Sequence, residues 1–203
     1  SESDKNVMKY EVNHQEIREG VQRLCADFPN SYWRQTDSAR AYPTEFVAAL
    51  TEAGYLSALI PEEYGGLSLT LSAGAAILEE IHRAGGNAAA CHAQMYTMGT
   101  VLRHGSDAQK EKYLPMIAEG SLRLQAFGVT EPTSGTDTTA LRTTARREGD
   151  KYIVNGQKIW TSRAEHSDLL LLLARTTPRD QVAKKTDGLS VFLVDMREVL
   201  DKS

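Results

Sequence analysis

The chain has 203 residues and a mass of 22.4 kDa, which is room for one large domain or two small ones. Hydrophobic residues make up 41% and charged residues 25%, a composition that permits a buried core and argues against general disorder. The 27 acidic side chains outnumber the 23 basic ones, giving a net charge of −4. A protein that binds nucleic acid through a basic face is therefore not expected.

The chain lacks the sequence signals of a membrane or secreted protein. Its longest uninterrupted apolar run, Leu169–Ala174, is far shorter than the roughly twenty residues of a membrane span, and the N-terminal segment has no apolar leader region. Cys25 and Cys91 lie far apart in helical-looking stretches, which predicts buried thiols rather than a disulfide or a metal pair. We expect a cytoplasmic protein, in the bacterial cytosol or, in a eukaryote, in the mitochondrial matrix.

The first part of the chain has the apolar spacing of helices. Residues at three- and four-residue steps predict four of them: Ile17–Phe28, after a capping-box-like Asn13 and Glu16; Pro43–Leu50, stopping at Gly54; Ile77–Ile81, ending at Gly85-Gly86; and Cys91–Leu102, stopping at Gly105. Ser106 and Gln109 form a second capping box, which predicts a short helix through about Leu114, before Pro115.

From Leu122 the pattern is that of strands. The predicted strands are Leu122–Thr130, Thr143–Arg147 and Tyr152–Val154 around a turn at 148–151, Gln157–Ser162, Leu169–Arg175 and Leu189–Val194. Asn155-Gly156 predicts a tight turn before the strand Gln157–Ser162, because both residues tolerate a positive φ. Helices followed by strands indicate an α+β fold, with an all-α domain at 1–121 and an antiparallel β domain at 122–203.

Most motifs of enzyme chemistry are missing from the sequence. It contains no Gly-x-Gly-x-x-Gly, no Gly-x-x-x-x-Gly-Lys and no Gly-x-Ser-x-Gly, and its five histidines lack metal-ligand spacing, so we expect no metal site. Glu131 and Asp137 leave two interpretations open. They could be a carboxylate pair for acid–base chemistry, or, as we favour, hydrogen-bonding carboxylates of a structural loop.

The stretch most suited to binding a ligand is Ala126–Asp137, where a strand runs into a loop of small hydroxyl residues. Thr130, Ser134 and Thr136 offer compact hydrogen-bonding side chains, and Gly135 permits the close approach of a backbone or a ligand. From these residues alone, the segment is either an ordinary bend or a binding loop.

Four sequence blocks together resemble the acyl-CoA dehydrogenase family. They are Gly54-Tyr55 leading to Ile60–Gly66, Gly105–Leu114, Val129–Asp137 and Asn155–Trp160, and they follow the family's order over nearly the whole chain. The resemblance implies an enzyme that uses FAD to oxidise the α,β bond of an acyl-CoA thioester to a trans-enoyl-CoA. It also implies a homotetramer or homodimer that passes its electrons to an electron-transferring flavoprotein.

The resemblance assigns binding roles to individual residues. Those expected at the flavin ring are Phe127, Val129, Thr130, Trp160, Thr161 and Ser162. Those expected at the substrate are Gly135 and Thr136 for the CoA chain, and Gln94, Met98 and Leu102 for the acyl cavity. A stripe of Met and Leu at helical spacing is also typical of residues in a protein core. For Gln94, Met98 and Leu102, a place in the core therefore remains an alternative to the acyl cavity.

The chain departs from the family pattern in three ways. Thr136 stands where the family has serine, and Ser162-Arg163 where it has a Thr-Asn pair. The family's chain is nearly twice as long, so we expect its catalytic glutamate, its C-terminal helical domain and the rest of the β domain outside these residues, and we assign no catalytic residue here. Two alternatives remain: a flavoenzyme of the same fold but of nitroalkane oxidase or flavin monooxygenase type, or a truncated, non-catalytic interaction module.

Overall fold

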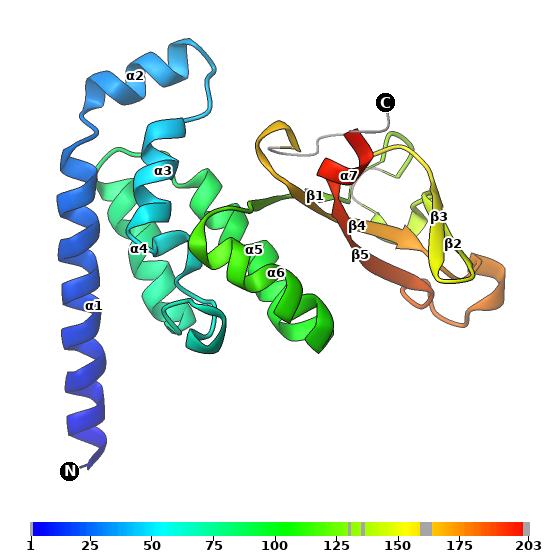
Figure 1. The fold of residues 1–203 in the computed structure, drawn as a ribbon, viewed down its shortest axis with the longest axis horizontal. Coiled ribbons are helices and arrows are strands. Elements are labelled where there is room, and N and C mark those ends of the chain that lie inside the picture. Colours follow the sequence, from blue (N-terminus) through cyan, green and yellow to red (C-terminus); the bar gives the residue numbers. More distant parts are fainter. Residues whose placement is uncertain (1, 130, 135–136, 159–163, 201–203) are drawn as a thin grey trace. The chain divides into compact units, whose positions relative to one another are not determined.

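The computed structural model describes residues 2–129, 131–134, 137–158 and 164–200 (Figure 1). The chain divides into two compact units, Ser1–Leu122 and Arg123–Ser203. The first unit is helical and the second is built on a β-sheet. The predicted order of a helical domain followed by a β domain is confirmed.

The described part of the helical unit contains six α-helices joined by short connections. They are α1 (Glu2–Ala26), α2 (Asn30–Ser38), α3 (Thr44–Glu52), α4 (Leu71–Arg83), α5 (Ala89–His104) and α6 (Asp107–Glu119), with single 3-10 turns at Tyr55–Ser57 and Glu62–Tyr64 between α3 and α4. The predicted helices are present. The sequence analysis missed α2, in which Trp33 alone is buried, because one apolar anchor does not make a periodic stripe.

Two helix boundaries differ from the prediction. Helix α1 begins at Glu2, so the expected start at Asn13 is wrong. Helix α6 continues through Pro115 to Glu119 and ends at Gly120, where φ is 86°. Proline removes one backbone hydrogen bond, and the burial of Ile117 in the next turn favours continuing the helix. The capping box of α6 is confirmed: the Gln109 amide donates to Ser106 Oγ over 3.1 Å.

The core of the helical unit is formed by the apolar stripes that the sequence shows. Its fully buried members include Val21, Phe46, Leu50, Ile77, Ile81 and Cys91, and the rings of Phe28, Tyr32, Trp33 and Phe46 pack edge to face beside them. Both cysteines are buried free thiols, as predicted, and burial raises the pKa of Cys91 to about 12.

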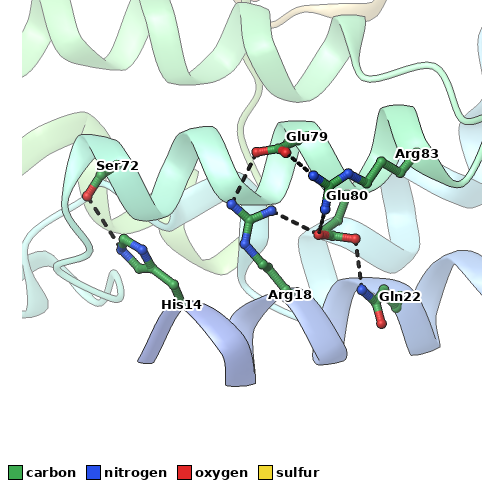
Figure 2. Close-up of polar contacts among 7 residues, drawn as sticks. All are labelled: His14, Arg18, Gln22, Ser72, Glu79, Glu80 and Arg83. Atoms are coloured by element: carbon green, nitrogen blue, oxygen red, sulfur yellow. Dashed lines mark hydrogen bonds and ion pairs between the residues drawn. The ribbon is translucent and has the colours of Figure 1, made fainter. Parts of the chain in front are cut away.

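Helix α1 is joined to α4 by charged and polar side chains as well as by apolar packing (Figure 2). Glu80 of α4 is only 2% exposed and accepts hydrogen bonds from Arg18 and Gln22 of α1 and from Arg83 of its own helix. These donors, Gln22 and Arg18 first, lower the pKa of Glu80 and keep it ionised.

The sheet of the second unit is centred on β4 (Leu169–Arg175). Strand β4 pairs antiparallel with β5 (Leu189–Asp195) along its whole length. It also pairs parallel with β1 (Leu124–Gly128). Strand β2 (Thr144–Glu148) joins β4 in parallel through a single pairing of Thr144 with Arg175, and β3 (Lys151–Asn155) is antiparallel to β2. A short helix, α7 (Met196–Leu200), follows β5.

The sheet is therefore mixed, and the prediction of an antiparallel β domain is wrong in this respect. The hydrophobic pattern of a strand does not encode the direction of its partner. The hairpin of β2 and β3 is confirmed. The prediction of a tight turn at Asn155-Gly156 leading into a strand is wrong for the described residues, because Gln157 and Lys158 belong to no strand. The rest of the predicted strand, residues 159–162, lies outside the described residues. Gly156 serves a close approach instead, since a Cβ there would lie 2.6 Å from the Thr143 Cα.

Candidate functional site

The residues expected at flavin and substrate lie in both units. Phe127 and Val129 are at the end of β1, and Gln94, Met98 and Leu102 are on α5. The others lie outside the described residues: Thr130, Gly135, Thr136, Trp160, Thr161 and Ser162.

The end of β1 is held by Lys158, a residue that the sequence analysis did not single out. The Lys158 side chain is 8% exposed, and its Nζ donates to the Val129 carbonyl over 3.1 Å. Its stem passes close to Gly128, where a Cβ would lie 3.4 Å from Lys158 Cγ and 3.2 Å from Leu172 Cδ1. A side chain at position 128 would therefore be tight against Leu172 and in contact with the lysine stem.

The carboxylate of Glu131 connects three segments of the β unit. It is 3% exposed, accepts from Lys158 Nζ over 2.8 Å and from the Thr143 amide over 2.9 Å, and accepts from the Arg142 amide as well. The end of β1, the residues that lead into β2 and the segment after β3 therefore meet at one buried ion pair.

The protonation of Glu131 shows what this carboxylate can do. Burial by itself would raise its pKa, but the donors from Arg142, Lys158 and Thr143 outweigh burial and lower the pKa to about 2. An ionised carboxylate with its oxygens already engaged is a poor proton acceptor at neutral pH.

Asp137 has partners of its own. It is exposed and accepts from the amide and hydroxyl of Thr139, which lower its pKa. Because Glu131 and Asp137 each have separate local partners, the geometry supports the structural-loop interpretation of these two acids.

The loop after β1 also contains a polar atom suited to a ligand. The Ser134 hydroxyl oxygen is buried and has no hydrogen-bond partner among the described residues. A buried hydroxyl is seldom left without a partner in a folded protein. The described residues contain no cluster of three or more His, Cys, Asp or Glu side chains able to hold a metal ion.

Helix α5 has a core face and a pocket face. Gln94 and Met98 are almost fully buried inside the helical unit, and Gln94 Nε2 donates to the Leu56 carbonyl over 3.0 Å. Leu102 instead borders a pocket of about 340 Å³, together with Leu59, Leu69, Leu71, Met95, Tyr96, Gly99 and Arg103. Tyr96, which is 60% exposed, was missed because it lies off the buried apolar stripe.

Among the described residues, no helix is both long enough and apolar enough to cross a bilayer.

Comparison with known proteins gives a consistent result. Residues 11–121 match the family model for the N-terminal domain of acyl-CoA dehydrogenase, and residues 126–200 match the model for its middle domain. The chain is 36% identical over 189 residues to a 3-(aryl)acrylate reductase of Clostridium sporogenes, an alignment that covers 90% of this chain and 49% of the relative.

Solved structures similar to this chain agree with it in fold, as two examples show. The glutaryl-coenzyme A dehydrogenase glutaryl-CoA complex is 31% identical, with a TM-score of 0.81 over 91% of this chain and 47% of that one. The FAD complex of PigA is 25% identical, with a TM-score of 0.79 over 90% of this chain and 48% of that one. This chain thus spans about half the length of the proteins it matches.

The two domain models together match most of the chain, in the order in which its helical and β units occur. The second of these structures, that of PigA, is an FAD complex. The chain belongs to the acyl-CoA dehydrogenase family.

Proposed function

We propose that this chain supplies the flavin-ring and CoA contacts of an enzyme that converts an acyl-CoA thioester to an enoyl-CoA by FAD-dependent α,β-dehydrogenation. FAD, when bound, supplies the two-electron acceptor for oxidation of the C–C bond. The residues of this chain bind and orient, and none of them is proposed as the base that removes the α proton.

The observation that carries this proposal is the contact of Lys158 with Val129 and Glu131. Lys158 precedes Trp160 by two residues, while Val129 and Glu131 flank Thr130. The segment that contains Thr130 and the segment that contains Trp160 are far apart in the sequence, yet each contributes one residue to the Glu131–Lys158 ion pair. If both segments contact one flavin ring, their neighbouring residues have to come together in this way.

The edge of an isoalloxazine has both N–H and C=O groups, and main-chain N–H and C=O groups at the end of β1 can pair with them. We assign main-chain contacts with it to Phe127, Val129 and Thr130, and a supporting hydroxyl to Ser162. We assign to Trp160, with Thr161 beside it in sequence, the packing that excludes water from one side of the ring. Gly135 and Thr136, which follow Ser134 in the sequence, are assigned to the CoA chain; the Ser134 hydroxyl is buried and has no partner among the described residues.

The acyl group is assigned to the pocket face of α5. Leu102 keeps the substrate role expected from the resemblance, and Tyr96 and Gly99 join it in lining the pocket. Gln94 and Met98 are assigned to the core of the helical unit, because both are buried and Gln94 is committed to the Leu56 carbonyl. By likeness to the family, we also propose an electron-transferring flavoprotein as electron acceptor and a homo-oligomeric assembly.

The visible spectrum tests the proposal. The protein expressed from its complete reading frame should be yellow, and a straight-chain or aromatic acyl-CoA added without oxygen should bleach the flavin band. A yellow protein that is bleached by nitroalkanes, or that consumes oxygen with a reductant, but ignores every acyl-CoA would contradict the proposed reaction. A colourless protein that takes up no added FAD would favour an interaction module instead.

A second candidate is the opposite direction at the same site, reduction of an activated C=C bond. It is supported by the 36% identity to a protein named for the reduction of 3-arylacrylates. Chemically reduced protein should then be reoxidised faster by an arylacrylic acid or its thioester than oxidised protein is bleached by the saturated analogue.

A further inference from the structure

We propose that the Glu131–Lys158 ion pair is a positioning device for the cofactor, which holds the Val129 carbonyl and the residues leading into β2 in one fixed arrangement. Neither residue is assigned contact with the substrate, so both would act through the backbone they hold. The inference deepens the proposed function and rests on it.

The sheet connects the end of β1 and the start of β2 only through β4. Strands β1 and β2 both pair with β4, but not with each other, and β2 meets β4 through a single pairing of Thr144 with Arg175. The ladder between them is therefore indirect: Gly128 pairs with Leu172, and Thr144 with Arg175, three residues further along β4. Glu131 adds a direct connection, since its carboxylate accepts from the amides of Arg142 and Thr143.

Lys158 completes the arrangement on the side of β1. Its Nζ lies 2.8 Å from Glu131 Oε2 and 3.1 Å from the Val129 carbonyl oxygen, so it engages both the carboxylate and the backbone assigned to the flavin edge. Both side chains are more than nine-tenths buried. A buried ion pair with further hydrogen bonds confines its members to a narrow geometry, and a cofactor site needs backbone held in that way.

The energetics of buried ion pairs indicate how to test the idea. Removing one partner leaves an uncompensated buried charge, whereas removing both avoids that penalty. The matched variants are Lys158→Met, which keeps the stem without the charge, Glu131→Gln, which keeps the shape, and the double variant. Lys158→Arg keeps the cation and serves as the rescue, and Glu148→Gln removes an exposed carboxylate paired with Arg146 on β2 as the control.

The experiment measures FAD affinity by fluorescence titration, the reduction potential of the bound flavin, and amide exchange at Arg142 and Thr143 without FAD. We expect Lys158→Met and Glu131→Gln each to weaken FAD binding at least tenfold, to shift the flavin potential and to speed exchange at both amides. The double variant should lose less than the two single losses multiplied, Lys158→Arg should recover most of the affinity, and Glu148→Gln should match the unaltered protein. If a single variant does not fold, the double variant, which lacks the ion pair without a leftover buried charge, should still bind FAD more weakly than the unaltered protein and exchange faster at both amides.

Three results would count against the inference in distinguishable ways. Folded single variants with unaltered FAD affinity, potential and amide exchange would overturn it while leaving the proposed function standing. Faster exchange with unaltered affinity and potential would show a structural ion pair only, and would also overturn it. Failure of the unaltered protein to bind FAD would overturn the proposed function and the inference together.

Discussion

Arg18 on α1 donates through Nη1 to Glu80 Oε1 on α4 over 2.9 Å, although the two residues are 62 positions apart in the sequence. The second terminal nitrogen of Arg18 reaches Glu79, so one guanidinium holds two successive acids of α4 (Figure 2). The two acids differ in burial, with side-chain exposures of 2% for Glu80 and 46% for Glu79. Their contributions to the stability of the helical unit should differ accordingly.

We expect Glu80→Gln to lower the free energy of unfolding of the helical unit by about 1–3 kcal/mol, because it leaves two arginines facing a neutral group at a buried position. Glu79→Gln, the matched control, should cost less than about 1 kcal/mol, since its partners remain in water. Urea unfolding followed by the fluorescence of Trp33, which is buried in this unit, measures both in a Trp160→Phe background. Equal losses would show that the burial of Glu80 does not matter.

The β unit should lose stability in acid through Glu131. Its pKa is about 2 in the folded chain against 4.5 ordinarily, so the group stabilises the fold above about pH 4.5. That contribution, at most about 3 kcal/mol from the shift, is lost as the pH falls from 4.5 towards 2. Unfolding of the unaltered chain and of Glu131→Gln at pH 7, 4 and 2.5 should give two curves that converge in acid. A difference that is constant with pH would contradict this account.

The two faces of α5 should respond differently to substitution. Gln94→Leu removes the donor to the buried Leu56 carbonyl, and it should cost about 1–3 kcal/mol of stability without changing which acyl-CoA is preferred. Leu102→Ala, on the pocket face, should be milder for stability and should shift the preference towards bulkier acyl groups. Thermal unfolding and a series of acyl-CoA titrations separate the two effects. A change of acyl preference in Gln94→Leu with stability intact would return that residue to the substrate site.

Trp160→Ala tests the flavin-side assignment that follows from the family resemblance. An indole beside the ring excludes water, so its removal should weaken FAD retention while the helical content, read by far-ultraviolet circular dichroism, stays near that of the unaltered protein. Loss of helix with FAD still bound would refute the role given to this residue.

The sequence determined the elements whose local pattern is strong. Strands β4 and β5 are runs of Leu, Val and Phe at the predicted positions, and the capping box at Ser106 begins α6 as predicted. The stripe of α5 is buried through Cys91, Met95 and Met98. The family, too, follows from the sequence, because its motifs are stretches of consecutive residues.

The tertiary structure decided which residues meet. No spacing rule pairs Glu131 with Lys158, 27 positions apart, because their contact depends on how β1, β2 and the segment after β3 come together. The direction of β1 beside β4 and the division of α5 into a core face and a pocket face were likewise undetermined. A local pattern records that a residue will be buried, and only the packing of distant segments determines what it is buried against.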